Sequence, residues 1–434
     1  SGGRAAFAVD DFPGSPDAPE ARIRGIVHAA GATGGPLHEF TVLLPVKRVL
    51  DGMFERSFHS LETSARFRIQ IALPPAALAT NALVWRIGDQ ESTLTGETLS
   101  ETMAIDVPLD GLAPGLHPFQ AVLKDGAGRE IARLDATLDK RPPMRNAVPI
   151  DRPSRAVVAD GRPFFVFAPL VHFFPHTSPE HIDRVINHFA DAGFRSIMVV
   201  GRQEIGTQKW GRVFERCHER NLKLIAWPGG FSGKQDNEIF RSFIERWREH
   251  PALLAWLPVD EPELYATPEA TRATIEFYQK LDPHHPVYAN NTVMGIPSRF
   301  AGLPGDLLSI DDYLTNREGR KVEEIVRQVE IMEQAARPTH RPVWIFLVGN
   351  NLYNHTREPT AAEQVAESYG SAVAGASGLV YFMGDPAERG HWRQLRQLNA
   401  EFAALESVLL SATPAPETRC SSGAIRFAAR RVGS

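Results

Sequence analysis

The chain has 434 residues, of which 43% are hydrophobic and 23% charged, and its formal net charge is −5. This composition is typical of a globular protein with ample material for a core, and the length predicts two or three domains. No basic stripe with interleaved aromatic residues is present, which argues against a nucleic-acid partner. No apolar run reaches the ~18 residues needed to span a bilayer, so membrane insertion is not expected.

The two cysteines, Cys217 and Cys420, lie far apart and indicate neither a disulfide framework nor a zinc site. Cys217 falls on the apolar face of the segment KWGRVFERCHER, which predicts a core position. The N-terminal stretch SGGRAAFAVDD contains no apolar signal-peptide core, and it leaves open whether a leader has been removed.

The first domain is expected over residues 1–148 and shows short alternating runs separated by turns rich in glycine and proline. The runs are EFTVLLPV, ARFRIQIAL, ALVWRIG, HPFQAVLKD and EIARLDATL. This spacing, with almost no helical period, predicts an antiparallel β-sandwich. The last two runs predict a hairpin whose turn lies at Asp125 to Gly128. The proline-rich segment 139–154 marks the domain boundary.

From residue 149 to 412 apolar strand-like runs alternate with amphipathic helical segments. The runs are FFVFAPLV, SIMVVG, LKLIAWPG, LLAWLPVD, PVYANNT, DLLSIDDYL, PVWIFLVGN and GLVYFMGD. Helix starts are predicted at Ser178-Pro179-Glu180, at Thr267-Pro268-Glu269 and at the capping box from Thr360 to Glu363. Two segments, 238–247 and 322–332, carry apolar residues at helical spacing.

Eight apolar strands alternating with helices indicate a parallel sheet covered on its outside, and eight strands close a (β/α)8 TIM barrel. A doubly wound open sheet is the competing architecture. It would call for a glycine-rich phosphate turn after the first strand, where the sequence reads APLVHFFPHTSPE. The expected fold class is therefore α/β, a TIM barrel preceded by a β-sandwich. Residues 413–434 are expected to form a C-terminal strand or the start of a further β-domain.

In such a barrel the chemistry lies at the C-terminal ends of the strands. Taken in chain order, the polar and aromatic residues at these ends are His172; Arg202 and Glu204; Trp227; Asp260 and Glu261; Asn290 and Asn291; Asp311, Asp312 and Tyr313; Asn350 and Asn351; and Asp385. The gathering of such residues on one rim predicts a site there. Asp311 and Tyr313 share strand parity, so we expect them to point the same way.

Asp260 and Glu261 end the fourth strand beside apolar walls, which can raise the pKa of a carboxyl group. Two carboxyls in different environments can divide acid and base roles across a glycosidic bond. Asparagine side chains suit sugar hydroxyls, because an amide both donates and accepts hydrogen bonds. Aromatic rings can stack on the apolar C–H faces of sugars, and the candidates are Trp227, Trp256, Tyr313, Trp344 and Tyr381.

Structural alternatives stand beside these interpretations. An Asp-Glu-Pro turn is common on surface loops, most tryptophans belong to cores, and Trp247 is expected to do so. Asp311 and Asp312 could simply cap the sixth strand. His172 and His176 have a spacing seen in helical metal sites, but Pro175 between them argues against a helix. No metal or cofactor is expected.

Residues 155 to 410 resemble the barrel of the clan A glycoside hydrolases, which include the family 2 and family 42 β-galactosidases. The resemblance rests on VVADGRPFFVFAP, HPALLAWLPVDEPE and EQVAESYGSAVAGASGLVYFMG, and a β-sandwich ahead of the barrel is similar to family 2. It implies that Glu261 is the general acid/base. In most of the clan an asparagine precedes this glutamate and contacts the sugar 2-hydroxyl, whereas this chain has Asp260.

A second departure lies at strand seven, where the clan places its nucleophilic glutamate. This chain reads PVWIFLVGNNLYNH, and Glu358 follows eight residues beyond Asn350. The second carboxylate could have moved to Asp311 or Asp312. The Asp260-Glu261 pair also resembles that of family 20 hexosaminidases, in which the acetamido group of the substrate attacks. Finally, the barrel could bind a glycan without cleaving it.

These observations predict a glycoside hydrolase for a bacterial, algal or plant poly- or oligosaccharide. Glu261 would protonate the leaving oxygen, Asp260 would orient the substrate or tune that glutamate, and Asp311 or Asp312 would supply the second carboxylate. The residues expected to bind substrate are His172, Trp227, Trp256, Asn290, Tyr313, Asn350, Tyr381 and Asp385. The expected partner is a carbohydrate, and such a substrate favours an extracytoplasmic location.

Overall fold

The computed structural model of the chain describes residues 20–27, 38–45, 48–201, 206–229, 237–292, 302, 304–314, 319–350, 357–382, 389–413, 418 and 427–432. The chain divides into two compact units. The first comprises Ser1–Phe54, Ser64–Leu112 and Leu116–Leu138, and the second comprises Glu55–Thr63, Ala113–Gly115 and Asp139–Ser434.

The first unit consists of antiparallel sheets, as the alternating runs predict. A three-stranded sheet has the order β3-β4-β7, and a four-stranded sheet has the order β6-β5-β8-β9. Their bounds are β3 Leu50–Phe54, β4 Ser64–Ile71, β5 Ala82–Ile87, β6 Gln90–Thr95, β7 Thr102–Pro108, β8 Gly115–Lys124 and β9 Glu130–Lys140. Strands β1 (Glu20–Val27) and β2 (His38–Pro45) pair with each other, and a single-turn helix α1 spans Pro75–Leu78.

The two larger sheets share one core, which makes this unit a sandwich. Along β4 every second residue is buried, so one face of the strand points inward. Phe54 and Phe67 of the smaller sheet pack edge-on with ring centroids 4.7 Å apart, and Phe119 of the larger sheet lies 4.3 Å from Phe67. The predicted β8–β9 hairpin is confirmed, and its turn is closed by backbone N–H groups that donate to the Asp125 carboxylate at 2.9 Å.

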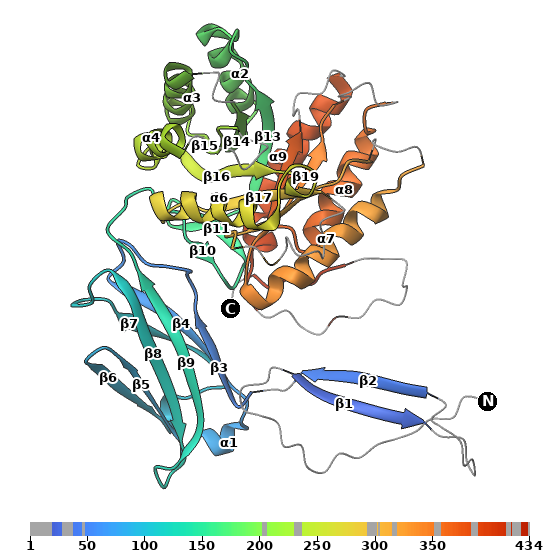
Figure 1. Cartoon of the computed structure of the whole chain (residues 1–434). Helices are drawn as coiled ribbons and strands as arrows, with labels where there is room; N and C mark the ends of the chain where they lie inside the picture. The colour runs from blue at the N-terminus through green and yellow to red at the C-terminus, as the bar shows by residue number, and fades with distance from the viewer. Residues whose placement is uncertain are drawn as a thin grey trace. The chain divides into compact units, whose positions relative to one another are not determined.

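The second unit is a closed barrel of parallel strands, so the barrel prediction is confirmed and the open sheet is excluded. Each of the predicted apolar runs supplies one strand (Figure 1). Their bounds are β13 Val166–His172, β14 Ser196–Val200, β15 Lys223–Trp227, β16 Leu253–Asp260, β17 Val287–Thr292, β18 Leu308–Asp311, β19 Val343–Val348 and β20 Gly378–Phe382.

Helices surround this barrel (Figure 1), and their bounds are α2 Pro179–Asp191, α3 Gly206–Glu219, α4 Asn237–Trp247, α5 Pro262–Tyr265, α6 Pro268–Leu281, α7 Val322–Ala336, α8 Ala361–Ala374 and α9 Arg389–Leu409. The three predicted helix starts are confirmed. Ser178 and Thr267 each accept a hydrogen bond from a first-turn backbone N–H, and Thr360 and Glu363 form a reciprocal capping box.

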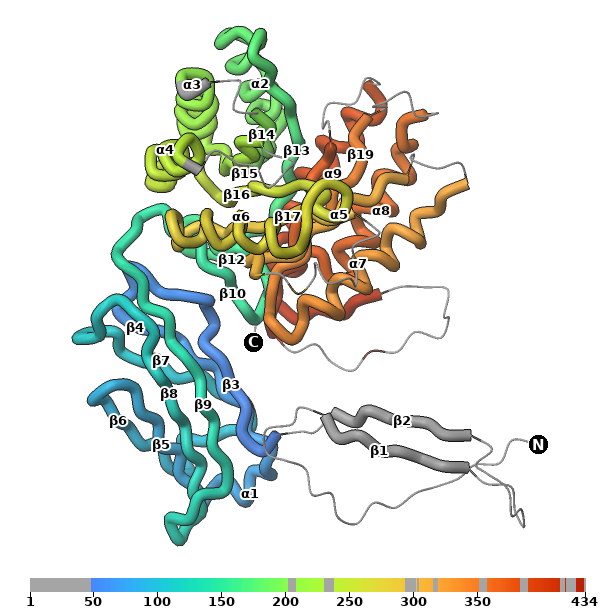
Figure 2. The backbone as a smooth tube through the Cα atoms, in the orientation of Figure 1, coloured from blue at the N-terminus to red at the C-terminus, as the bar shows by residue number. Residues whose placement is uncertain are grey.

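Two apolar cores separate the inside of the barrel from its outside. Alternate strand residues such as Leu254, Tyr288 and Trp344 fill the interior, while Trp256, Tyr278 and Tyr381 pack between strands and helices. A small sheet of β10 (Ile150–Asp151), β11 (Ala156–Ala159) and β12 (Arg162–Phe164) lies next to the barrel (Figure 2). Its apolar residues belong to the interior core. Cys217 and Trp247 are buried in the outer core, as predicted.

Within the part of the chain that the structure describes, no helix is long and apolar enough to span a membrane. The predicted C-terminal strand in residues 413–434 falls largely outside the described residues, and residues 427–432 form no strand.

Candidate active site

Four carboxyl groups gather at the C-terminal end of the barrel. Asp260 ends β16, Glu261 follows it, Glu263 lies on the short helix α5, and Asp311 ends β18. Asp311 and Glu261 are joined by a side-chain hydrogen bond, and the negative charges of Asp260 and Glu261 both raise the pKa of Asp311. The predicted grouping of strand-four and strand-six acids is therefore present, and Asp311 is its strand-six member.

The backbone of Glu261 has a conformation that is unusual for a residue with a side chain. Its φ of 45° and ψ of 53° place it in the left-handed region, which costs a non-glycine residue about 1 kcal/mol or more. Its N–H donates to the Asn290 carbonyl at 2.8 Å, which ties the turn to the neighbouring strand β17. This turn ends β16 abruptly and starts α5 at Pro262, so the Glu261 side chain leaves the strand at the barrel rim.

Asp260 is held by its neighbours on β17 and β18. The Asn290 side-chain amide donates to the Asp260 carboxyl at 3.0 Å, and Asn290 accepts a hydrogen bond from the Ser309 hydroxyl at 2.7 Å. Burial raises the pKa of Asp260 to about 7, with smaller contributions from the charges of Glu261 and Glu263, while the Asn290 hydrogen bond opposes this rise. Asn290, predicted to contact substrate, thus acts on Asp260.

Three members of the carboxyl cluster, Asp260, Glu263 and Asp311, have raised pKa values. Burial is the largest cause that holds the pKa of Asp311 well above its usual range, followed by the charges of Asp260 and Glu261. Burial and the charge of Glu261 also raise the pKa of Glu263, whose carboxylate accepts a hydrogen bond from the Thr292 N–H at 3.3 Å. Carboxyls this close cannot all ionise, because each charge opposes the next.

Asp312, the other predicted strand-six acid, does not join this cluster. Its side chain is buried and forms an ion pair with Arg320, whose guanidinium also lies 3.6 Å from Glu324 of α7. The Asp312 charge raises the pKa of Glu367 on α8, so Asp312 faces the helical layer. The structure therefore places the Asp312 side chain against the helical layer and away from the carboxyl cluster, as expected when successive residues of a strand point to opposite faces.

Aromatic rings line the mouth of the barrel next to the carboxyls. The His172 ring lies 6.5 Å from Trp227 and 5.9 Å from Phe382, and Phe382 stacks on Tyr313 at 5.5 Å. Trp227 belongs to the interior core, and Tyr313 and Phe382 pack against it. Tyr313 therefore points inward, as the parity it shares with Asp311 predicts, and the structure brings His172, Trp227 and Tyr313 together.

Two predicted sugar platforms lie elsewhere. Trp256 is fully buried in the outer core, and its indole N–H donates to the Asp282 carboxylate at 2.7 Å. Tyr381 is equally buried, and its hydroxyl is hydrogen-bonded to Ser368 of α8. Both predictions are wrong for the same reason, since these residues occupy strand positions that face the helices. Trp344 faces inward but is fully buried within the barrel core.

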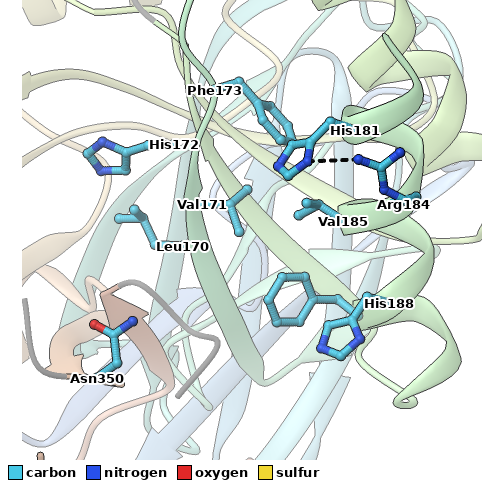
Figure 3. Close-up of a pocket in the computed structure, with 10 residues that line it drawn as sticks. Leu170, Val171, His172, Phe173, His181, Arg184, Val185, His188 and Asn350 are labelled. Atoms are coloured by element: carbon cyan, nitrogen blue, oxygen red, sulfur yellow. Dashed lines mark hydrogen bonds between the residues drawn. The ribbon is translucent and has the colours of Figure 1, made fainter. Parts of the chain in front are cut away.

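A cavity of about 470 Å³ lies at the C-terminal end of β13. His172 and Asn350 line one side of it, and His181, Arg184 and His188 of α2 line the other (Figure 3). The Arg184 guanidinium is hydrogen-bonded to the His181 ring at 3.2 Å (Figure 3). The volume is in the range of small-molecule sites. The predicted Asn350 therefore lines the same cavity as His172.

At the end of β19, Val348, Gly349 and Asn350 provide no carboxyl group, as the sequence indicates. Glu358 is buried and pairs with His391 of α9 at 3.0 Å. Arg202, Glu204, Asn351 and the predicted substrate-binding residue Asp385 lie outside the described residues. Among the residues that are described, no group of three or more His, Cys, Asp or Glu side chains is arranged to hold a metal ion.

Two members of the site were missed from the sequence. Glu263 lies two residues after Glu261, and a signal for it was the proline that restarts the chain as a helical turn at residue 262. Phe382 follows Tyr381 in β20, and strand parity from the inward-facing Val380 identifies Phe382 as the aromatic residue at the mouth.

The comparisons with known proteins find likenesses only among solved structures. No family model matches the chain, and no curated protein matches it. A putative glycoside hydrolase from Bacteroides vulgatus has a TM-score of 0.47 and 12% identity, with 78% of this chain and 77% of that chain covered. An endo-1,4-β-mannanase from Rhizomucor miehei has a TM-score of 0.45 and 12% identity, with 57% and 98% covered.

A β-glucuronidase from Parabacteroides merdae has a TM-score of 0.42 and 12% identity, with 80% of this chain and 49% of that chain covered. The chain spans about half the length of the β-glucuronidases it matches. These solved structures include barrel glycosidases, as the resemblance in the sequence leads us to expect. The barrel of this chain rests on its own strand order, and likenesses of this size assign no role to any residue.

Proposed function

We propose that the protein is a glycoside hydrolase that uses Glu261 as its general acid/base and Asp311 as the second carboxyl. The observation that carries the proposal is the hydrogen bond between these two side chains at the C-terminal end of the barrel. Burial and the neighbouring charges raise the pKa of Asp311, which supplies this pair with a proton for acid catalysis. The left-handed backbone of Glu261 supports the proposal, because strain of this kind concentrates at functional sites.

In the reaction the proton that Asp311 holds passes across this hydrogen bond to Glu261, which leaves the negative charge on Asp311. Glu261 donates the proton to the leaving oxygen as the bond from that oxygen to the anomeric carbon breaks. Asp311 faces the positive charge that develops on the anomeric carbon. Water then supplies a hydroxyl to this carbon and returns a proton to Glu261. Asp260 tunes the pair through its charge, and a polysaccharide substrate would favour an extracytoplasmic location.

The distance between the two carboxyls when substrate is bound decides the anomeric configuration of the product. Inverting enzymes hold their carboxyls ~6.5–9.5 Å apart so that a water molecule fits between substrate and base, whereas retaining enzymes need ~5–5.5 Å. Hydrogen-bonded carboxyls lie closer together than either range, so they separate when substrate enters, and the anomer of the product reports the distance they reach. A substrate-assisted reaction, in which Asp260 orients an acetamido group of the sugar, retains configuration and requires an N-acetylated substrate.

One observation favours a second candidate, a barrel that binds carbohydrate without cleaving it. The end of β19 carries Val348, Gly349 and Asn350, where barrel glycosidases of this type carry a nucleophilic acid. The buried carboxyls argue against this candidate, because burying several of them is unfavourable and binding alone does not require it. The two candidates differ in whether the native protein releases product.

The test is a sugar-release screen over polysaccharides and synthetic aryl glycosides, with native protein, Glu261→Gln and the control Glu276→Gln. Glu276 is an exposed glutamate on α6 that pairs with Arg272 at 3.7 Å. We expect release by the native protein and the control, and a loss of roughly 10²-fold or more in Glu261→Gln. Equal rates in all three proteins would refute the assignment of Glu261. Saturable binding without release would establish the binding barrel instead.

A further inference from the structure

The turn that follows β13 holds an aromatic ring out into solvent. Phe174 is 50% exposed, next to Phe173, which is buried in the outer core. The Phe174 N–H donates to the Thr177 hydroxyl at 2.9 Å, and the Thr177 N–H donates to the Phe174 carbonyl at 2.9 Å. The Pro175 carbonyl accepts a hydrogen bond from Lys209 of α3. The exposed ring therefore lies on a turn whose backbone is fixed by its own hydrogen bonds.

A second ring from the same turn supports Phe174. The His176 ring is exposed and stacks on Phe174, with the centroids 5.5 Å apart and the ring planes within 3° of parallel. The stack covers the facing sides of the two rings and fixes the plane of Phe174, which presents a flat apolar face and remains 50% exposed. Holding such a face in water is unfavourable, so a partner with an apolar face of its own is expected to cover it.

The flat face is continuous with the candidate active site through a series of ring contacts. Phe174 lies 6.2 Å from His172, His172 lies 5.9 Å from Phe382, and Phe382 lies 5.5 Å from Tyr313. Tyr313 is two residues beyond Asp311 on the inward face of the same segment. We call this series, from Phe174 and His176 through His172 and Phe382 to Tyr313, the aromatic track. It joins the exposed rim to the carboxyl cluster.

We propose that Phe174 and His176 form an outer sugar-binding subsite, so that the substrate is an oligo- or polysaccharide chain that extends from the carboxyl cluster across the β13 side of the rim. This inference rests on the proposed function. Sugar rings have apolar C–H faces and polar edges, and an exposed aromatic ring covers the first while the edges stay in water. The track places aromatic rings in succession from Tyr313 outward, and Phe174 at its outer end is the exposed ring against which a sugar can stack.

The subsite predicts that chain length matters and that Phe174 is the reason. The substrates are a small aryl glycoside, which reaches only the carboxyl cluster, and a series of oligosaccharides of increasing length with the same sugar. The variants are Phe174→Ala, which removes the outer ring, Phe174→Tyr, which keeps it, and Phe174→Leu, which keeps apolar area without a flat face. Phe427→Ala serves as the matched control, because Phe427 is also an exposed phenylalanine, in the C-terminal segment 427–432.

For the longer chains we expect Phe174→Ala to lower kcat/KM about 3- to 10-fold, mainly through KM, the scale of one aromatic contact. Phe174→Leu is expected to behave like Phe174→Ala, and Phe174→Tyr and Phe427→Ala like the native protein. All variants should cleave the aryl glycoside at the native rate. His176→Ala removes the backing ring and should change KM in the same direction, which provides a second variant that leaves Phe174 in place.

Two failures are distinguishable. If native protein cleaves the aryl glycoside and Phe174→Ala matches it at every chain length, the outer subsite is refuted and the proposed function stands. An equal loss on the aryl glycoside and on long chains would also refute it, because the effect would then lie at the carboxyl cluster. If native protein cleaves nothing, the proposed function fails, and retardation of native protein and Phe174→Ala in gels containing polysaccharide decides the subsite, with equal retardation overturning it.

Discussion

The side-chain amide of Asn290 donates a 3.0 Å hydrogen bond to Asp260, and the two residues are register partners on adjacent strands β16 and β17. This bond is the main local interaction that opposes the effect of burial on the Asp260 carboxyl, whose pKa is about 7. Asn290 accepts in turn from Ser309, so three neighbouring strands fix the position of one carboxyl. An uncharged residue, Asn290, therefore partly offsets the rise that burial causes in the pKa of Asp260.

Replacing Asn290 by alanine should raise the pKa of Asp260 further, because burial is then opposed by no hydrogen bond from this side chain. If ionised Asp260 is the active form, activity of the native protein rises as pH increases through about 7. In Asn290→Ala this rise should move to higher pH by roughly 1 unit, the scale of one hydrogen bond to a buried carboxylate. The pH dependence of kcat/KM measures the shift.

Asn291→Ala is the control for this shift. Asn291 is adjacent in sequence, but its side-chain amide donates to the Ala289 and Ser309 carbonyls at 3.4 and 3.0 Å. Its removal should leave the pH profile in place. A profile that moves equally in both variants would mean that Asn290 acts through the packing of β17 and not through Asp260.

The adjacent acids Asp311 and Asp312 should separate activity from stability. Asp311→Asn removes a carboxyl that is hydrogen-bonded to Glu261 and should lower activity roughly 10²-fold with little change in the free energy of unfolding. Asp312→Asn leaves only Glu324, 3.6 Å away, to balance the Arg320 guanidinium and should lower the free energy of unfolding by up to about 3 kcal/mol. Urea denaturation and initial rates measure the two effects, and the reverse pattern would contradict the placement of these side chains.

The sequence predicts the barrel well because its strands are apolar along their whole length and its helices carry clear start signals. An error of a residue or two in the bounds of runs such as SIMVVG and PVWIFLVGN does not change the predicted number of eight strands. The capping box at Thr360 and Glu363 is a local pattern that needs no tertiary information. The location of the acids at the ends of β16 and β18 follows from this count alone.

The face on which each side chain lies is harder to predict from a fully apolar strand. In a half-exposed strand the alternation of polar and apolar residues marks the inward face, but β16 and β20 are buried on both sides. Trp256 and Tyr381 therefore looked like residues of the mouth, although both face the helices. Once one residue of a strand is known to face the barrel interior, as Leu257 and Val380 do, the facing of the other residues follows from alternation. The sequence alone does not identify that first residue.

Trp256→Phe tests this correction directly. The substitution removes the hydrogen bond from the indole N–H to Asp282, a buried carboxylate that also accepts from the His285 ring at 2.9 Å. We expect the free energy of unfolding to fall by about 2 kcal/mol, the scale of a hydrogen bond to a buried charge, while KM for any substrate stays unchanged. If instead KM increased several-fold and the free energy of unfolding stayed at its native value, Trp256 would contact substrate at the mouth of the barrel.

Glu367 on α8 should make stability fall as pH rises. It is fully buried, and burial first, then the charges of Glu363 and Asp312, hold its pKa well above the ordinary value of 4.5. The folded state therefore binds a proton that the unfolded state releases above pH 4.5. Its contribution to the free energy of unfolding is complete below that pH and is lost progressively as pH increases toward the folded pKa. Glu367→Gln, which cannot ionise, should flatten this slope in urea denaturation above pH 5.

Glu363, one turn earlier on the same helix, supplies a matched control of opposite sign. Its side-chain hydrogen bonds with Arg357 lower its pKa to about 2, and the capping hydrogen bonds with Thr360 act in the same direction. Its contribution is therefore complete above the ordinary pKa of 4.5 and is lost as pH decreases toward 2. Glu363→Gln should weaken the acid-side loss of stability. It also removes one of the charges that raise the pKa of Glu367, so it should narrow the pH range of the Glu367 slope without abolishing that slope. If Glu363→Gln removes the slope above pH 5 as completely as Glu367→Gln does, Glu367 does not carry a proton in the folded state.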